Sequence, residues 1–241
     1  MILILLRTLL SYLLLGLILA IIAIPCLIFI LLPAKWRYDN KLFFWLSYFF
    51  YKSTLWVSFV PITVVGKENI PDEPSIIVPN HQSSLDIPLV GALMNGYPHI
   101  WMAWANLQRF YVLGIFLRRM AILIDTSSPM KAMRSLIQAI NMMKEAKRHV
   151  IIFPEGGRYI DGNKIHDFFS GFVIIAKKTG RPIVPVLILN AYKVYPPGSF
   201  LIHRYPVKVI VGKPFYYKEG ESDAACRNRV RSWFVDNVEK E

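Results

Sequence analysis

The chain has 241 residues, enough for one domain of ordinary size and an additional membrane segment. Its hydrophobic fraction of 54% exceeds that of typical soluble proteins, and 28 Lys and Arg against 16 Asp and Glu give a net charge of +12. This charge favours an anionic partner such as a lipid surface, a phosphorylated substrate or an acidic carrier. No metal-ligand spacing or RNA-binding motif accompanies the charge, so we expect no nucleic-acid partner. Cys26 and Cys226, the only cysteines, exclude a disulfide framework and a zinc site and fit a domain facing the reducing cytosol.

The first element in chain order is an apolar stretch from Thr8 to Leu32. Only Ser11, Tyr12, Gly16 and Pro25 interrupt it. About 20 such residues are needed to cross a hydrocarbon core, whereas the apolar region of a signal peptide is shorter and precedes a cleavage site. We therefore predict an uncleaved membrane anchor.

A second apolar stretch, Leu42 to Val60, is rich in aromatic residues and follows the basic residues Lys35, Arg37 and Lys41. Aromatic and basic side chains gather at the headgroup level, so this stretch either spans the membrane or lies in its interface; a re-entrant hairpin broken at Pro33 is a further alternative. The basic residues predict a cytoplasmic-membrane location with the main domain facing the cytoplasm. Residues 1–60 are thus expected to form an apolar helical hairpin that anchors a domain at 61–241.

Beyond Val60, short β-rich runs alternate with helical patterns, as expected of an α/β domain with a central mixed sheet flanked by helices. Strands are predicted at Ile62–Val65, Ser75–Val78, Ile100–Ala103, Ala121–Ile124, Val150–Phe153, Ile183–Leu189 and Val207–Val211. Helices are predicted at Leu85–Asn95, Leu107–Met120, Phe168–Thr179 and Ala224–Val238. Another helix begins at Ser128-Pro129, and its apolar residues recur at a spacing that predicts core packing: Met130, Met133, Leu136, Ile137, Ile140 and Met143.

The first segment that carries chemistry, Val78 to Asp86, follows an apolar strand and enters a helix. In one ideal helix His81 and Asp86 would point about 140° apart. If His81 lies in the turn instead, Asp86 falls in the first helical turn and can orient the imidazole as a general base. Ser83-x-x-Asp86 also matches a helix-capping pattern, which is compatible with that role. Ser83 and Ser84 adjoin His81, but the chain has no G-x-S-x-G nucleophile motif.

The second segment, Phe153 to Arg158, again follows an apolar strand. Gly156 and Gly157 would let backbone amides approach a ligand, Arg158 offers a planar donor fork for phosphate, and Glu155 could hold Arg158 or a substrate hydroxyl. The alternative is a glycine-rich turn with a solvated Arg. No glycine pattern for nucleotide phosphates is present, so we expect no nucleotide cofactor.

Together, Asn80-His81-x4-Asp86, Phe153-Pro154-Glu155-Gly156-x-Arg158 and Pro182 to Val186 resemble the glycerolipid acyltransferase family, in particular the bacterial 1-acylglycerol-3-phosphate acyltransferases. The resemblance extends over roughly Ile62 to Val211 and implies a glycerol-3-phosphate acyltransferase-like fold. It implies that His81 is the base and Asp86 its partner, and that Glu155, Gly156, Gly157 and Arg158 bind the phosphate end of a lysophospholipid acceptor. It also implies a thioester donor, acyl-CoA or acyl carrier protein, with no metal and no resident cofactor.

The sequence departs from the family pattern at three places. Gly157 stands where Thr is frequent, Trp104-Ala105-Asn106 lacks basic residues and Glu, and Thr126 follows Ile124-Asp125 where Arg is frequent. Arg118 or Arg119 is a candidate replacement for that Arg. Transfer to 1-acyl-sn-glycerol-3-phosphate is the expected function; another lysolipid acceptor, such as a lysophospholipid with a headgroup or an ornithine lipid precursor, and a non-catalytic lipid-binding protein are the alternatives.

Overall fold

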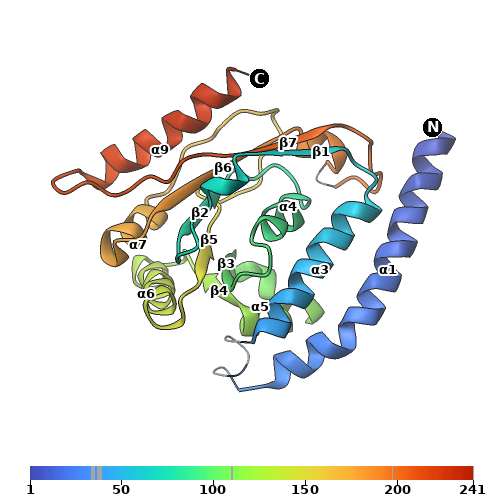
Figure 1. Ribbon diagram of the computed structural model, residues 1–241, viewed down its shortest axis with the longest axis horizontal. Helices are drawn as coiled ribbons and strands as arrows, with labels where there is room; N and C mark the ends of the chain where they lie inside the picture. The colour runs from blue at the N-terminus through green and yellow to red at the C-terminus, as the bar shows by residue number, and fades with distance from the viewer. Residues whose placement is uncertain (34–35, 37–39, 110, 197, 241) are drawn as a thin grey trace.

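A computed structural model describes residues 1–33, 36, 40–109, 111–196 and 198–240; Lys35 and Arg37 lie outside the described residues. All seven predicted strands form one sheet in the order β1-β7-β6-β2-β5-β3-β4 (Figure 1). Their bounds are β1 Ile62–Val65, β2 Ile76–Pro79, β3 His99–Trp104, β4 Ala121–Ile124, β5 His149–Ile151, β6 Ile183–Leu189 and β7 Val207–Val211. Neighbouring strands are parallel except β6 and β7, which confirms the predicted central mixed sheet.

Helices cover both faces of the sheet because its central strands are apolar on both sides. Ile76 and Val78 of β2 belong to the core shared with α6 (Pro129–Ala146), α7 (Gly171–Thr179) and α9 (Asp223–Val238). Ile77, between them, faces the core shared with α4 (Asp86–Leu93) and α8 (Ala191–Val194). This alternation follows from the two-residue period of a strand. The flanked α/β fold predicted from the sequence is therefore confirmed.

Three local predictions differ from the structure. The helix predicted from Leu107 is split into a 3-10 turn, η2 (Ala105–Arg109), and the helix α5 (Tyr111–Met120). The helix α8 was not predicted, because four residues are too few to show a period. In α6, Met143 is buried, but Met130, Met133 and Ile137 are exposed, so the prediction of core packing is wrong for these three. These three residues lie three and four positions apart, on a stripe of the helix beside the buried stripe. The apolar surface of α6 is therefore wider than the surface that contacts the core.

The apolar N-terminal residues form the long helix α1 (Ile2–Leu31), which packs beside α3 (Lys41–Val57) as a helical hairpin (Figure 1). Residues 2–22 have a mean hydropathy of 2.4 and are mostly exposed, so this segment is long and apolar enough to cross a membrane. Arg7 and Thr8, near the start of α1, bond to the backbone of Ile202. Phe29, near its end, packs with Met120 of α5. Both ends of α1 therefore contact the main domain, and the helix lies along it.

The aromatic helix α3 is fixed to the sheet by a chain of polar contacts. The indole of Trp101 donates to the Tyr51 hydroxyl (3.1 Å), which lies 3.3 Å from Nε2 of His99. Nδ1 of His99 lies 2.9 Å from the carbonyl oxygen of Tyr97. A Cβ atom at Gly91 would lie 2.5 Å from the Tyr51 ring, so only glycine permits this approach of α3 to α4.

Candidate active site

The turn that carries His81 follows β2 and is fixed to the neighbouring strand β6. The buried side chain of Asn80 donates to the carbonyl of Ile188 (2.9 Å) and accepts from its N–H (2.7 Å). This pair continues the ladder between β2 and β6 for one residue beyond the end of β2. The backbone that enters the turn therefore has a single position.

His81 and Asp86 meet as the sequence predicted, with Nδ1 of the imidazole 2.8 Å from Oδ2 of the carboxylate. Asp86 is the first residue of α4 and is fully buried. The same oxygen accepts the N–H groups of Gln82 (2.6 Å) and Ser83 (2.7 Å). Half of the capping pattern is thus present: the carboxylate accepts the Ser83 N–H and also holds the imidazole, whereas the Ser83 hydroxyl donates to the carbonyl of Tyr195 instead of capping α4.

The ring of His81 has a fixed plane and one available nitrogen. It stacks on Phe153, with ring centroids 4.0 Å apart and planes 20° from parallel. Because Nδ1 donates to an acceptor-only carboxylate, the proton of the neutral ring sits on Nδ1. Nε2 has no hydrogen-bond partner within the described part of the chain, and the side chain is 17% exposed. Nε2 is therefore the atom that can accept a proton from a bound molecule.

Glu155 holds the His81 turn from the other side. Its Oε2 accepts the N–H of His81 (2.8 Å), and its Oε1 accepts the N–H of His166 (3.1 Å). The side chain is 3% exposed, and burial raises the pKa of the carboxyl group, an effect that these two N–H donors partly offset. The sequence predicts that Glu155 holds Arg158 or contacts the acceptor; in the structure both of its oxygens accept backbone N–H groups, and these bonds fix the backbone of the His81 turn.

Arg158 extends across to the His81 turn. Its Nη1 donates to Oγ of Ser84 (2.6 Å), and the residue is exposed. Gly156 adopts φ +65°, and a Cβ there would lie 2.5 Å from the ring of Phe169, so this position requires glycine. A Cβ at Gly157 would meet only ordinary contacts, the nearest being Tyr159 at 3.4 Å. The structure gives no steric reason why Gly157 stands where Thr is frequent in the family.

Sequence reasoning missed several neighbours of the site. The side chain of Gln82 donates to Asn163 Oδ1 (3.0 Å), which ties the turn to the segment beyond Arg158. A second His–Asp pair joins His166 Nε2 to Asp161 Oδ1 (2.9 Å), and this bond lowers the pKa of Asp161. The ring of Tyr159 lies 3.7 Å from that of His166. Asp161 and His166 are five residues apart, like His81 and Asp86 but in reverse order, and that spacing was the available signal.

The acyltransferase family model matches residues 61–189, more than half of the chain, and includes both segments of the site. The chain belongs to the acyltransferase family. The resemblance identified from its motifs is therefore confirmed.

Similar proteins include 1-acyl-sn-glycerol-3-phosphate acyltransferases from plants and bacteria. The chloroplastic protein of Brassica napus is 31% identical over 188 residues, which are 73% of this chain and 53% of that protein. The Borreliella burgdorferi protein is 31% identical over 177 residues, 70% of each chain. The chain spans about half the length of its plant relatives.

A solved structure shares the whole architecture. The crystal structure of the 1-acyl-sn-glycerophosphate (LPA) acyltransferase PlsC from Thermotoga maritima superimposes with a TM-score of 0.77 at 26% sequence identity. The match covers 99% of this chain and 97% of that one, so it includes the N-terminal helices as well as the sheet.

Proposed function

We propose that this protein transfers a fatty acyl group from a thioester to the free hydroxyl of 1-acyl-sn-glycerol-3-phosphate, giving phosphatidic acid for phospholipid synthesis. The observation that carries the proposal is the His81–Asp86 pair, whose carboxylate is fully buried and whose Nε2 remains available. The relatives from Brassica napus and Borreliella burgdorferi are 1-acyl-sn-glycerol-3-phosphate acyltransferases, which supports the same acceptor. The donor is acyl-CoA or acyl carrier protein.

His81 acts as general base in the proposed reaction. Nε2 accepts the proton of the acceptor hydroxyl as its oxygen attacks the thioester carbonyl carbon. Asp86 stabilises the imidazolium through Nδ1, and Phe153 keeps the ring plane fixed. When the tetrahedral intermediate collapses, the C–S bond breaks and the imidazolium returns its proton to the thiolate. The steps need neither a metal nor a resident cofactor.

Arg158, with Gly156 and Gly157, would receive the phosphate of the acceptor. A guanidinium binds a phosphomonoester through paired, charge-assisted hydrogen bonds, whereas its present partner is the neutral hydroxyl of Ser84. If the Arg158 guanidinium released the Ser84 hydroxyl and bound the phosphate instead, the acceptor would lie beside the turn that carries His81.

We further propose that residues 1–60 anchor the protein to the cytoplasmic membrane and that residues 61–241 form a catalytic domain facing the cytoplasm. The exposed apolar surface of α1 supports membrane association. Trp45, Phe49 and Trp56 of α3 are exposed too, as expected of aromatic side chains at headgroup level. The lipid acceptor would then diffuse to the site within the membrane.

A second candidate acceptor is a lysolipid with another headgroup, favoured by Thr126 and by Trp104-Ala105-Asn106, where the family pattern has charged residues. Arg118, a candidate replacement for the Arg that the family has at the position of Thr126, donates to the carbonyl of Gln108 (3.5 Å) in the neighbouring turn η2.

The test is a radiolabelled acyl-donor assay with purified protein in detergent. Wild type, His81→Ala and Asp86→Asn are incubated with acyl-CoA or acyl carrier protein and a panel of lysolipids. Transfer to lysophosphatidic acid that depends on both residues supports the proposal. Transfer only to another lysolipid would show that lysophosphatidic acid is not the acceptor. Absence of transfer to any lysolipid would favour a non-catalytic lipid-binding protein.

A further inference from the structure

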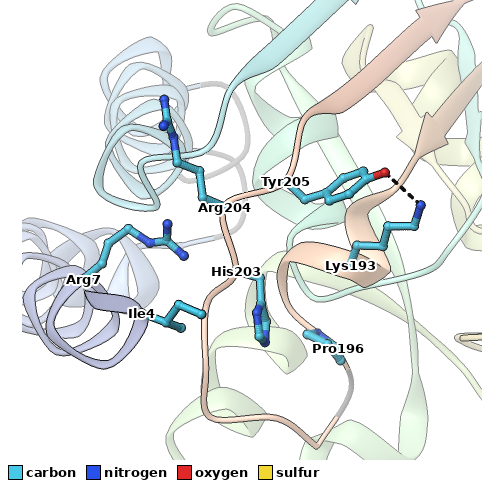
Figure 2. Close-up of a pocket in the computed structure, with 7 residues that line it drawn as sticks. All are labelled: Ile4, Arg7, Lys193, Pro196, His203, Arg204 and Tyr205. Carbon is cyan, nitrogen blue, oxygen red and sulfur yellow. Dashed lines mark hydrogen bonds between the residues drawn. The ribbon is translucent and has the colours of Figure 1, made fainter. Parts of the chain in front are cut away.

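A basic pocket of about 500 Å³ lies where the start of α1 meets the segment between β6 and β7. Figure 2 shows Ile4 and Arg7 reaching from α1 towards the stretch that carries His203, Arg204 and Tyr205. Lys193 and Pro196 line it from the other side. The lining includes neither His81 nor Arg158, so this is a separate site.

The pocket concentrates positive charge without a compensating carboxylate. Arg7, Lys193 and Arg204 line it with His203, and its lining contains no Asp or Glu. Arg204 is exposed and makes no hydrogen bond or salt bridge to any described residue. Like charges that converge in this way destabilise the protein unless an anion binds between them.

Arg7 has donor capacity that the fold does not use. One guanidinium nitrogen donates to the carbonyl of Ile202, but the buried Nε atom has no partner among the described residues. Lys193 donates to the neutral hydroxyl of Tyr205 (3.1 Å), as the dashed line in Figure 2 marks, and its ammonium group lies over the rings of Tyr205 and Tyr192. It has no carboxylate partner among the described residues. A phosphate oxygen is a stronger partner for either group than the neutral acceptor that it now has.

The surroundings of the pocket are those of a lipid rather than of a soluble anion. Arg7 is the only charged residue in α1, and it lies near the start of the helix. Leu3, Leu6 and Leu10 around it are exposed at 78, 58 and 45%. A basic side chain in such a helix extends to the headgroup level while the helix contacts acyl chains. A ligand here would thus present phosphate to the pocket and hydrocarbon to α1.

We propose that this pocket binds the phosphate group of an anionic diacyl phospholipid of the surrounding membrane. The lipid would bridge α1 to the segment before β7 through Arg7, Lys193 and Arg204. A diacyl lipid lacks the glycerol hydroxyl that is acylated in the acceptor, so it would not be a substrate at His81. Basic pockets at helix junctions recognise anionic headgroups by this chemistry.

The test uses the full chain in neutral detergent and measures thermal stability against short-chain lipids, because a ligand that binds the folded state raises Tm. Dioctanoyl phosphatidylglycerol should stabilise the protein more than dioctanoyl phosphatidylcholine at equal concentration. Lys193→Gln with Arg204→Gln should raise the half-maximal phosphatidylglycerol concentration about 30-fold, since each charge near an anionic headgroup contributes about fivefold. Arg204→Gln alone, at an exposed side chain, should give part of this effect.

The matched control is Lys144→Gln with Lys178→Gln, which removes the same charge from exposed positions on α6 and α7. It should leave the phosphatidylglycerol response unchanged. If the half-maximal phosphatidylglycerol concentration rose equally in the control and pocket variants, the proposed binding site would be wrong, and the effect would be one of overall charge. Stabilisation by inorganic phosphate or free CoA that depends on Lys193 and Arg204, in place of that by phosphatidylglycerol, would overturn the lipid assignment.

Discussion

The two sides of the candidate active site differ in how firmly they are held. On the His81 side, Asp86 Oδ2 accepts three N–H groups, and both Glu155 oxygens accept backbone N–H groups from separate segments. On the Arg158 side, an exposed guanidinium has one bond to a serine hydroxyl. In the proposed mechanism, the buried side is preorganised for proton transfer, and the exposed side exchanges its serine partner for the phosphate of the acceptor. Changes on the first side should therefore lower kcat, and changes on the second should raise the acceptor KM.

The largest effect is expected from His81→Ala. Loss of a general base should lower kcat by about 10²–10⁴-fold. Thermal stability should change little, because Glu155 binds the backbone of residue 81 rather than its ring. Radiolabelled transfer and melting curves in detergent check both points; transfer at the wild-type rate would remove His81 from the mechanism.

Glu155→Gln should have the next largest effect on kcat and should test whether the buried side of the site affects kcat rather than the acceptor KM. A Gln side chain offers one acceptor oxygen instead of two, so either His81 N–H or His166 N–H loses its partner. We expect kcat to fall about 100-fold, as when a buried hydrogen bond to a charged group is removed, with the acceptor KM within a few-fold of wild type. A change confined to KM would place Glu155 on the substrate side instead.

Arg158→Ala should raise the acceptor KM about tenfold through loss of a charge-assisted bond to phosphate, with the KM of the donor unchanged. Arg158→Lys should restore binding only in part, because an ammonium group lacks the paired donor geometry. Steady-state kinetics with lysophosphatidic acid measure both. Equal acceptor KM values in all three proteins would remove Arg158 from the acceptor site.

The smallest effect is expected from two buried histidines that belong to neither side of the candidate active site. Burial lowers the pKa of His99 to about 4 and that of His149 to about 3. Both are neutral in the folded state and bind protons in the unfolded state below pH 6.5, so acid favours unfolding. Between pH 7.5 and 6.0, unfolding free energy should fall by about 0.8 kcal/mol for each.

Urea unfolding in detergent at several pH values measures this slope. His149→Asn should make it shallower, because Oδ1 of Asn can accept the Ser75 N–H that now bonds to Nδ1 of His149 and does not titrate. His203→Asn, outside the core, is the control and should keep the contribution of both buried histidines. An unchanged slope in His149→Asn would contradict the assignment.

The sequence predicted the geometry of the His81 turn better than that of the loop that carries Arg158. Apolar runs marked all seven strands, and the need for Asp86 to reach His81 placed Asp86 in the first turn of the helix, which in the structure begins at Asp86 itself. The partners of Glu155 could not be predicted, because they are backbone N–H groups and leave no trace in residue type. The contacts of α1 with Ile202 and Met120 were equally hidden, since a helix that is apolar on every side has no periodicity to indicate which face is covered.

The contacts at both ends of α1 bear on attempts to make a water-soluble fragment. Without this helix the N–H of Ile202 loses the Thr8 hydroxyl, and the carbonyl of Phe200 loses Tyr12. In a chain that also lacks α3, Met120 of α5 loses its apolar neighbours, and Gly91 of α4 loses the ring of Tyr51 that covers it. A chain shortened to begin at Ile62 should therefore aggregate although its sheet is complete. Helix α1 is thus a structural part of this fold and not a removable tether.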